Sequence, residues 1–414
     1  MGTYLANVSL FDGRTRRSKA GVLVEDGTIA WVGAHARAPK RMAAASEIDG
    51  SGRTLTPGLI DCHVHLCFDG SADFAAEARE MTSDAFAAVK AIRNAELDLG
   101  SGVTTVRDLG GRGDVAIQVG RAVERGLVKG PRILAAGRAL TITGGHGHNV
   151  GLAREVDGPD AVRTAVREEI RAGATAIKVM ATGGVLTPGI THDFTAFTQE
   201  ELDAAVDEAH SWGRVVGAHA IGSVGIVRAV RAGVDSIEHG SMLTAAGARL
   251  MKERGVFHVP TISALRGIVE HPDEVAAYAL EKAIVLKERS REAFRRSLHA
   301  GVPIACGTDA GTPFNPHGNT PLEIVRMVEW GMTPRAAMGA ATSAAAALLR
   351  LPDLGTVETG KAADLVLYDE DPIERIEAVL RPRMVMRAGA VVVGRASGRT
   401  AGRRAPERRR GSRR

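Results

Sequence analysis

The stretch Thr56-Pro57-Gly58-Leu59-Ile60-Asp61-Cys62-His63-Val64-His65-Leu66 decides the fold of this chain. Its apolar pair Leu59-Ile60 follows a Pro-Gly turn and predicts a buried strand. Side chains two residues apart on a strand point to the same side, so His63 and His65 face one site. Two neutral imidazoles aimed from one rigid element can bind a metal ion, although a His-x-His pair can also be hydrogen-bonded without a metal.

From this strand onward the chain alternates short apolar segments with helical patterns. We expect eight strands, over residues 59–66, 104–109, 132–136, 176–181, 215–220, 236–239, 258–262 and 304–308. The expected helices include residues 83–99, 159–172, 199–212, 224–232, 273–300, 321–330 and 334–349. This alternation over residues 57–352 predicts an α/β fold, a closed (β/α)8 TIM-like barrel. The alternative is an open doubly wound sheet, but the sequence lacks the glycine-rich phosphate loop that it would need.

The two ends of the chain lack this strand–helix alternation and show the sequence pattern of β-hairpins. Residues 1–56 contain short apolar runs separated by glycine turns, with Asp26-Gly27 as the clearest turn, and the same pattern returns in residues 353–393. Neither segment is large enough to fold alone, so we expect one composite β-sandwich domain with the barrel inserted between its halves. Residues 394–414 are rich in Arg, Gly and Ser and predict a disordered tail.

Charge and composition indicate an ordinary globular protein with a basic tail. The net charge is +5, but the tail holds nine arginines and one glutamate, so the remainder is mildly acidic. No aromatic residue is interleaved with the tail arginines, which argues against nucleic acid as a partner. Three cysteines without CxxC spacing, no signal sequence and no long apolar run predict a cytoplasmic protein without a membrane span. We also expect a homo-oligomer.

Polar residues stand at the ends of several predicted strands. They are Lys178 in the fourth strand, His219 in the fifth, His239 in the sixth and Asp309 after the eighth. Active sites of (β/α)8 barrels lie at the carboxyl ends of the strands, so we expect these residues to gather beside the His-x-His pair.

Lys178 is the most informative of these residues. It lies between Ile177 and Val179, and an ammonium is costly to bury without a partner. Burial lowers a lysine pKa, and a neutral amine can act as a nucleophile, form a Schiff base or react with CO2 to give a carbamate. The alternative is a lysine paired with a carboxylate of the barrel.

These motifs together resemble the amidohydrolase superfamily, in its binuclear-metal branch. The matching residues occur in the family's order and are Pro57-Gly58-Leu59-Ile60-Asp61, His63, His65, Lys178, His219, His239 and Asp309. The phrases Lys178-Val179-Met180-Ala181-Thr182-Gly183-Gly184 and Gly307-Thr308-Asp309-Ala310-Gly311-Thr312-Pro313 are similar to those of prolidase-like and imidazolonepropionase-like members. The resemblance spans residues 5 to 393 and also implies the split β-sandwich.

The resemblance implies two divalent metal ions, with zinc as the expected metal. His63, His65 and Asp309 would hold one ion, His219 and His239 the other, and an N6-carboxylated Lys178 would bridge them. A hydroxide between the ions would attack the amide, and Asp309 would carry its proton to the leaving nitrogen.

Substrate contacts are expected from the loops above the metal ligands. The resemblance implies that His146 contacts the substrate near its carbonyl and acts with Asp309 in catalysis. His148 shares the same glycine-rich loop, the backbone N–H groups of Gly183 and Gly184 are candidates for binding a substrate carboxylate, and His192 is a further candidate. Some dipeptidase members have an aromatic hydroxyl where this chain has Ile221, so their specificity does not transfer directly.

The expected activity is metal-dependent hydrolysis of the amide bond of a small substrate, either a dipeptide, as in prolidases, or an N-acyl amino acid. An alternative is the hydrolysis of a cyclic amide, as in imidazolonepropionase. A non-catalytic binding protein is less favoured, because all six ligand positions are intact.

Overall fold

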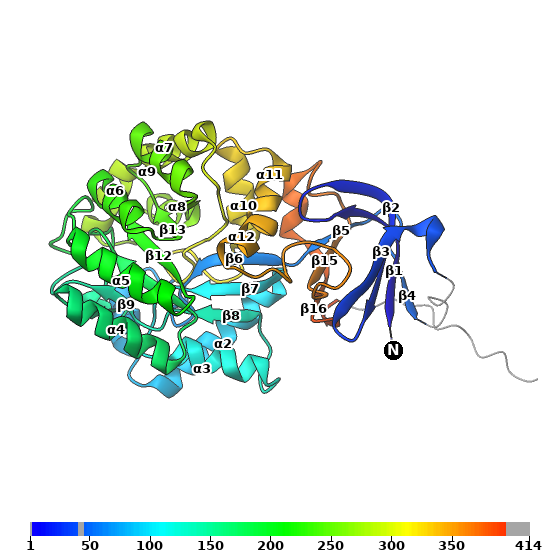
Figure 1. The fold of residues 1–414 in the computed structure, drawn as a ribbon, viewed down its shortest axis with the longest axis horizontal. Coiled ribbons are helices and arrows are strands. Elements are labelled where there is room, and N and C mark those ends of the chain that lie inside the picture. Colours follow the sequence, from blue (N-terminus) through cyan, green and yellow to red (C-terminus); the bar gives the residue numbers. More distant parts are fainter. Residues whose placement is uncertain (1, 40–44, 395–414) are drawn as a thin grey trace, which may run out of the picture.

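The computed structural model describes residues 2–39 and 45–394. A barrel of strands and helices lies beside a β-sheet domain that contains both the first and the last strands (Figure 1). The chain therefore has the predicted α/β fold, a (β/α)8-type barrel with a β domain built from its two ends. The predicted arginine-rich tail lies outside the described residues, apart from Gly394.

Seven parallel strands form most of the barrel wall. They are β6 (Leu59–Val64), β7 (Val103–Asp108), β8 (Arg132–Ala135), β11 (Ala176–Met180), β12 (Val215–Ala220), β13 (Ser236–His239) and β14 (Phe257–Val259). The short strands β9 (Ala139–Thr141) and β10 (Ala153–Glu155) extend the sheet beside β11. The N–H of Thr175 donates to Ala135 O at 2.9 Å and connects β8 of one sheet to the start of β11 in the other.

The eighth expected strand, residues 304–308, is less regular than predicted. It forms a single bridge, Ile304 with His258, and contacts β6 through separate hydrogen bonds. Cys62 N donates to Cys306 O at 2.9 Å, and Asp309 N donates to His63 O at 2.7 Å. The neighbouring strand β14 has only three residues, which leaves little length for a continuous ladder. These bonds still connect the two edges of the barrel.

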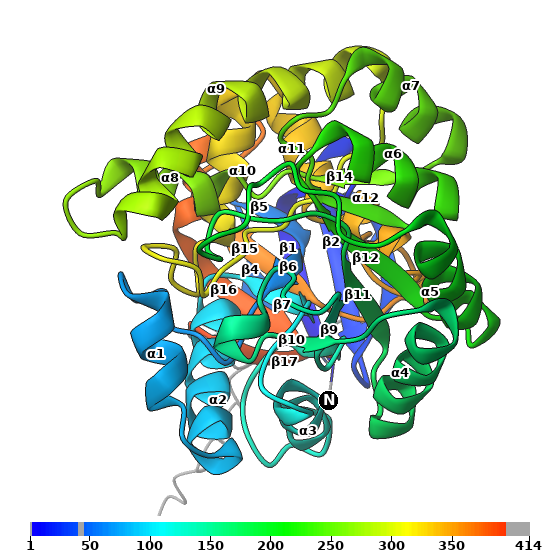
Figure 2. The same ribbon diagram turned by 90° about the vertical axis from the view of Figure 1, so that its left-hand side faces the viewer.

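Helices surround the strands, as Figure 2 shows in a view that looks into the barrel. They are α1 (Phe74–Glu80), α2 (Asp84–Gly100), α3 (Val115–Glu124), α4 (Pro159–Ala172), α5 (Gln199–Ser211), α6 (Ser223–Ala232), α7 (Ala245–Arg254), α8 (Ile262–Glu270), α9 (Ala277–Ala300), α10 (Thr320–Glu329), α11 (Pro334–Ala340) and α12 (Ser343–Leu348). Among the described residues, no helix is both long and apolar enough to cross a membrane.

The predicted strand over residues 258–262 is wrong at its end. The strand stops at Val259, Pro260 follows, and Thr261 adopts a left-handed conformation with φ of 47° before α8 begins. Proline cannot donate to a sheet ladder, and the carboxylate of Glu323 accepts the N–H groups of Ile262 and Ser263 at 2.7 and 2.8 Å. Glu323 thus satisfies the first turn of α8 from another helix.

Within residues 2–39 and 45–394, the β domain is one hydrogen-bonded sheet of eight strands. Its N-terminal members are β1 (Thr3–Phe11), β2 (Arg16–Glu25), β3 (Thr28–Ala34), β4 (Ser46–Asp49) and β5 (Thr54–Pro57), and its C-terminal members are β15 (Leu365–Tyr368), β16 (Pro382–Arg387) and β17 (Ala390–Val393). The two groups meet where β5 pairs antiparallel with β15. The chain passes from β5 through Gly58 directly into β6, so this sheet anchors the first barrel strand. The division at residues 56 and 353 stays a prediction.

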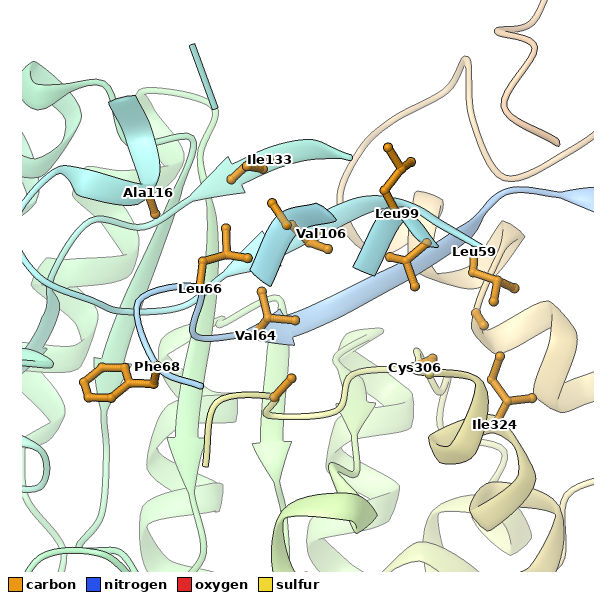
Figure 3. Packing of buried hydrophobic residues seen from close by; sticks show 14 of the residues in the cluster. Leu59, Val64, Leu66, Phe68, Leu99, Val106, Ala116, Ile133, Cys306 and Ile324 are labelled. Carbon is orange, nitrogen blue, oxygen red and sulfur yellow. The ribbon is translucent and has the colours of Figure 1, made fainter. Parts of the chain in front are cut away.

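Packing fixes the orientation of β6. Leu59, Val64 and Leu66 belong to a buried apolar cluster with Val106 of β7 and Ile324 of α10 (Figure 3). These side chains are 0% exposed and leave no alternative position for the strand. From this strand the His63 ring reaches Lys178 of β11 and Glu238 of β13.

Candidate metal centre and substrate pocket

All six predicted ligand residues line one pocket at the carboxyl ends of the barrel strands. They are His63, His65, Lys178, His219, His239 and Asp309. They come from β6, β11, β12, β13 and the two segments that follow β6 and residue 308. Convergence of donors from so many strands is the geometry by which a barrel holds a catalytic site.

His63 is held from behind by a buried acid. Its Nδ1 lies 2.9 Å from Glu238 Oε2, and the other oxygen of Glu238 accepts from Arg107 at 2.9 Å. Arg107 also donates to Cys62 O at 2.6 Å, and both Arg107 and Glu238 are 0% exposed. Because burial lowers the pKa of His63, the ring is neutral, donates from Nδ1 and presents the lone pair of Nε2 to the pocket.

The other three histidine rings are fixed in the same manner. His65 Nδ1 bonds to Gly110 O at 2.8 Å, His219 Nε2 to Gly183 O at 2.9 Å and His239 Nδ1 to Thr261 Oγ1 at 2.7 Å. A carbonyl oxygen only accepts, so the bonded nitrogens of His65 and His219 carry the proton and their opposite nitrogens are left as ligands. Burial lowers the pKa of His219 and of His239.

Asp309 meets these rings at the centre of the site. Its Oδ1 lies 3.2 Å from His63 Nε2 and 3.0 Å from His65 Nε2. Ligand atoms of His63, His239 and Asp309 all lie within 4.8 Å of one another, which suits a metal ion. Burial raises the pKa of Asp309, but the neighbouring His63, His65 and Lys178 outweigh it and hold the pKa below its ordinary value, so the carboxylate stays charged.

Both His239 and Asp309 have left-handed backbones, with φ of 66° and 61°. Non-glycine residues rarely adopt this conformation, and such strain concentrates at functional sites. At each of these two residues the left-handed backbone ends the extended conformation of the strand. Both side chains line the pocket.

Lys178 lies within the barrel and is 1% exposed. Burial lowers its pKa to about 8, and its Nζ lies 3.3 Å from His63 Nε2. Among the residues that the structure describes, no carboxylate forms an ion pair with Lys178 within 4.0 Å, which disfavours the ion-paired alternative. An amine with a pKa near 8 is partly neutral at physiological pH, as carbamate formation requires.

His146 lies at the side of this cluster. Its ring centroid is 4.4 Å from that of His219, and its Nδ1 lies 2.8 Å from Thr187 Oγ1. Burial lowers the pKa of His146 to about 3, so the ring is neutral. Gly184 allows this position, since a Cβ there would lie 2.4 Å from His146 Nε2.

The structure does not place His148, His192 or Gly183 on the wall of the pocket, and their roles as substrate contacts stay predictions. His148 is exposed and bonds through Nδ1 to Gly145 O at 2.7 Å, because the short η3 helix (His148–Val150) turns it away from the pocket. His192 is half-buried and does not line the pocket. The N–H of Gly183 donates to Phe194 O at 2.8 Å, so this donor is already engaged. Gly183 and Gly184 act on His219 and His146 instead.

Apolar side chains form the remaining wall of the pocket. Phe74 of α1, Val150, Leu152 and Ile221 contribute to it, as do Val185 and Leu186, and α8 adds Ala264, Leu265 and Ile268. The pocket encloses about 740 Å³, its open mouth included. Apart from the ligand cluster, no charged side chain of the described residues lines it.

Sequence reasoning missed the polar residues behind the ligands. Arg107 and Glu238 are charged residues inside predicted strands of the barrel, as Lys178 is, and this position is a signal that could have found them. Thr187 and α8 gave no such signal, because their roles depend on tertiary contacts.

Comparison with known proteins agrees with this geometry. The family model described as "Amidohydrolase family" matches residues 54–392. The chain belongs to the amidohydrolase family. The amidohydrolase is 34% identical to ochratoxinase of Aspergillus niger over 403 residues, which cover 90% of this chain and 82% of the relative. It is also 29% identical to imidazolonepropionase of Ectopseudomonas mendocina, with 94% of this chain and 97% of the relative covered.

A solved structure extends the comparison. The amidohydrolase superposes on the crystal structure of a Xaa-Pro dipeptidase with bound methionine in the active site at a TM-score of 0.89 and 35% identity, covering 95% of this chain and 100% of that one. The amidohydrolase is therefore an enzyme that hydrolyses carbon–nitrogen amide bonds.

Proposed function

We propose that this amidohydrolase cleaves the amide bond of small substrates, dipeptides or N-acyl amino acids, at a centre of two divalent metal ions. The observation that carries the proposal is the convergence of four histidines, one lysine and one aspartate on a single buried pocket. The similarity to a Xaa-Pro dipeptidase and to ochratoxinase supports the substrate class.

The residues present fit such a centre. His63, His65 and His219 each have one ring nitrogen held by a protein oxygen, which leaves the opposite nitrogen as a ligand. His63, His65 and Asp309 would hold one ion, His219 and His239 the other, with Lys178 as a carboxylated bridging ligand. Zinc suits imidazole and carboxylate donors. Bound ions would make hydroxide available near neutral pH and polarise the amide carbonyl.

Asp309 is the proposed proton carrier. Its low pKa keeps it as a carboxylate, which accepts the proton of the attacking water and returns it to the leaving nitrogen. His146 faces the same space and would donate from Nε2 to the substrate carbonyl.

The lining of the pocket also bears on the substrate. An apolar wall without charged side chains favours a substrate with an uncharged, apolar group beside the scissile amide, since a buried charge would find no partner there. The three cysteines are buried and free, which agrees with the predicted cytoplasmic location. The homo-oligomer stays a prediction.

A substrate panel tests the proposal. Purified protein loaded with Zn2+ is assayed against Xaa-Pro and other dipeptides, N-acyl amino acids with apolar acyl groups, and imidazolone-type cyclic amides. We expect turnover of the first two classes and its loss in Asp309→Asn, while the exposed Asp353→Asn control keeps wild-type activity. Hydrolysis of the cyclic amides alone would favour the imidazolonepropionase-type alternative, and turnover of no class would contradict both.

A further inference from the structure

The loop of residues 184–187 carries three lining residues of the pocket, Val185, Leu186 and Thr187. It lies between β11 and α5 and has no regular secondary structure. We propose that Lys282 of α9 is a positioning residue that holds this loop and, through Thr187, fixes the orientation and tautomer of His146. The inference rests on the proposed function for its effect on catalysis.

Two side chains of α9, one helical turn apart, bind all four consecutive carbonyls of the loop. Lys282 Nζ donates to Thr187 O at 2.7 Å, to Gly184 O at 3.2 Å and, more weakly, to Val185 O at 3.5 Å. Tyr278 Oη donates to Leu186 O at 3.2 Å. An ammonium has three N–H donors, and all three of them reach this loop.

The loop depends on these donors because backbone carbonyls away from water must be paired. Val185 and Thr187 are 8% and 1% exposed, so solvent cannot replace Lys282 fully. The Lys282 ammonium also lies 5.6 Å from the centroid of the Tyr278 ring, a cation–π distance that keeps the two side chains together. Loss of the ammonium would leave three carbonyls without their partner.

Thr187 connects the loop to His146. Its Oγ1 accepts the N–H of Gly147 at 3.0 Å and lies 2.8 Å from His146 Nδ1. Gly147 N–H uses one lone pair of the hydroxyl, and among the described residues His146 Nδ1 is the only acceptor within hydrogen-bond reach of its proton. The hydroxyl therefore donates to Nδ1, which places the ring proton on Nε2. A neutral ring of this tautomer presents an N–H donor to the pocket, as binding of a substrate carbonyl requires.

The other end of the loop also touches the ring. Gly184 lies so close to His146 that a Cβ would be 2.3 Å from its Cε1, and Gly184 O is bound by Lys282. The same ammonium therefore holds the backbone on both sides of the loop, beside the ring at Gly184 and behind its Nδ1 at Thr187. Displacement of the loop would move both contacts together.

The test compares Lys282→Met with Lys287→Met, a matched control at an exposed lysine of the same helix. Thr187→Val removes the hydroxyl and Thr187→Ser keeps it. Three properties are measured: kcat and KM for the best amide of the panel, hydrogen exchange of the amides of residues 184–195, and the 15N shifts of His146 in histidine-labelled protein, assigned with His146→Gln. Metal content and thermal unfolding show that each variant is loaded and folded.

We expect Lys282→Met to speed exchange of the loop, to shift the His146 resonances and to lower kcat/KM by about 10- to 100-fold at unchanged metal content. Thr187→Val should reproduce the resonance shift and the kinetic loss, Thr187→Ser should restore both, and Lys287→Met should match the wild type. Unchanged His146 resonances in both Lys282→Met and Thr187→Val would overturn the inference, as would a folded, loaded Lys282→Met with wild-type kcat/KM. If the wild type hydrolyses no amide, the proposed function fails, while the exchange and resonance readouts still decide the positioning role.

Discussion

Glu238 lies directly behind His63, with its Oε2 2.9 Å from His63 Nδ1. Its second oxygen accepts from Arg107 and Ser236, so both oxygens of this buried carboxylate are engaged. The acid fixes which nitrogen of His63 faces the pocket, in the manner of the carboxylate–histidine pairs that support metal ligands.

Glu238→Gln tests this support. We expect the variant to bind Zn2+ about 10- to 100-fold more weakly and to lose activity in parallel, because the amide no longer holds the Nδ1 proton of His63 as a carboxylate does. Competition with a coloured chelator measures the affinity for Zn2+. Urea unfolding measures how much stability the variant loses because Arg107 no longer has a carboxylate partner. Glu253→Gln on the exposed face of α7 is the control. Equal affinity in Glu238→Gln and wild type would refute the supporting role.

Gly184→Ala tests the fit of His146. A methyl group at this position would lie 2.3 Å from the ring, so the ring must move, and we expect kcat/KM to fall about 100-fold at unchanged metal content. Gly100→Ala is the control, since a Cβ there has nothing within 4 Å and the backbone φ is not positive. Steady-state kinetics with a metal assay measure both quantities. Wild-type turnover in Gly184→Ala would show that His146 tolerates displacement and has no role at the carbonyl.

Glu323→Gln tests a pH dependence of stability. Burial raises the pKa of Glu323 from its ordinary 4.5 to about 7, although the donors at Ile262 and Ser263 oppose this shift. Between these pH values the unfolded chain has lost the proton and the folded chain retains it, so rising pH favours unfolding. The contribution is fully present below pH 4.5 and is lost as the pH rises through about 7.

We therefore expect the free energy of unfolding of the wild type, relative to Glu323→Gln, to fall by roughly 3 kcal/mol at most between pH 4.5 and 8. Urea titrations at several pH values measure this difference. Because the other buried acids are common to both proteins, their contributions cancel. A constant difference across the range would show that the Glu323 pKa is not raised.

The barrel, and the gathering of polar residues at the ends of its strands, follow from periodicity and strand-end chemistry. The strand–helix alternation places Lys178 and His219 at the centre of the barrel, because both residues lie within regular strands, β11 and β12. The helix over Pro159–Ala172 has its predicted bounds, with Pro159 in its first turn and Gly173 ending it at φ of 113°. Local signals of this kind are readable before any tertiary structure is known.

Other features depend on contacts between distant segments. His239 and Asp309 reach the site through left-handed backbones, which residue type alone does not reveal. β14 stops at Val259 and α8 begins at Ile262, where the carboxylate of Glu323, a residue of another helix, accepts the first N–H groups. The placement of His148 is likewise not readable from its loop sequence, because it depends on the short η3 turn, in which His148 bonds to Gly145 O and stays exposed.

The most direct test of a two-metal amide hydrolase is the metal content of the active protein, measured by mass spectrometry of purified wild type and Asp309→Ala beside their amide turnover. We predict two divalent ions per chain in active wild type, loss of activity on chelation with recovery on adding Zn2+, and loss of both metal and turnover in Asp309→Ala. Full turnover by a metal-free wild type, or by Asp309→Ala, would contradict the account.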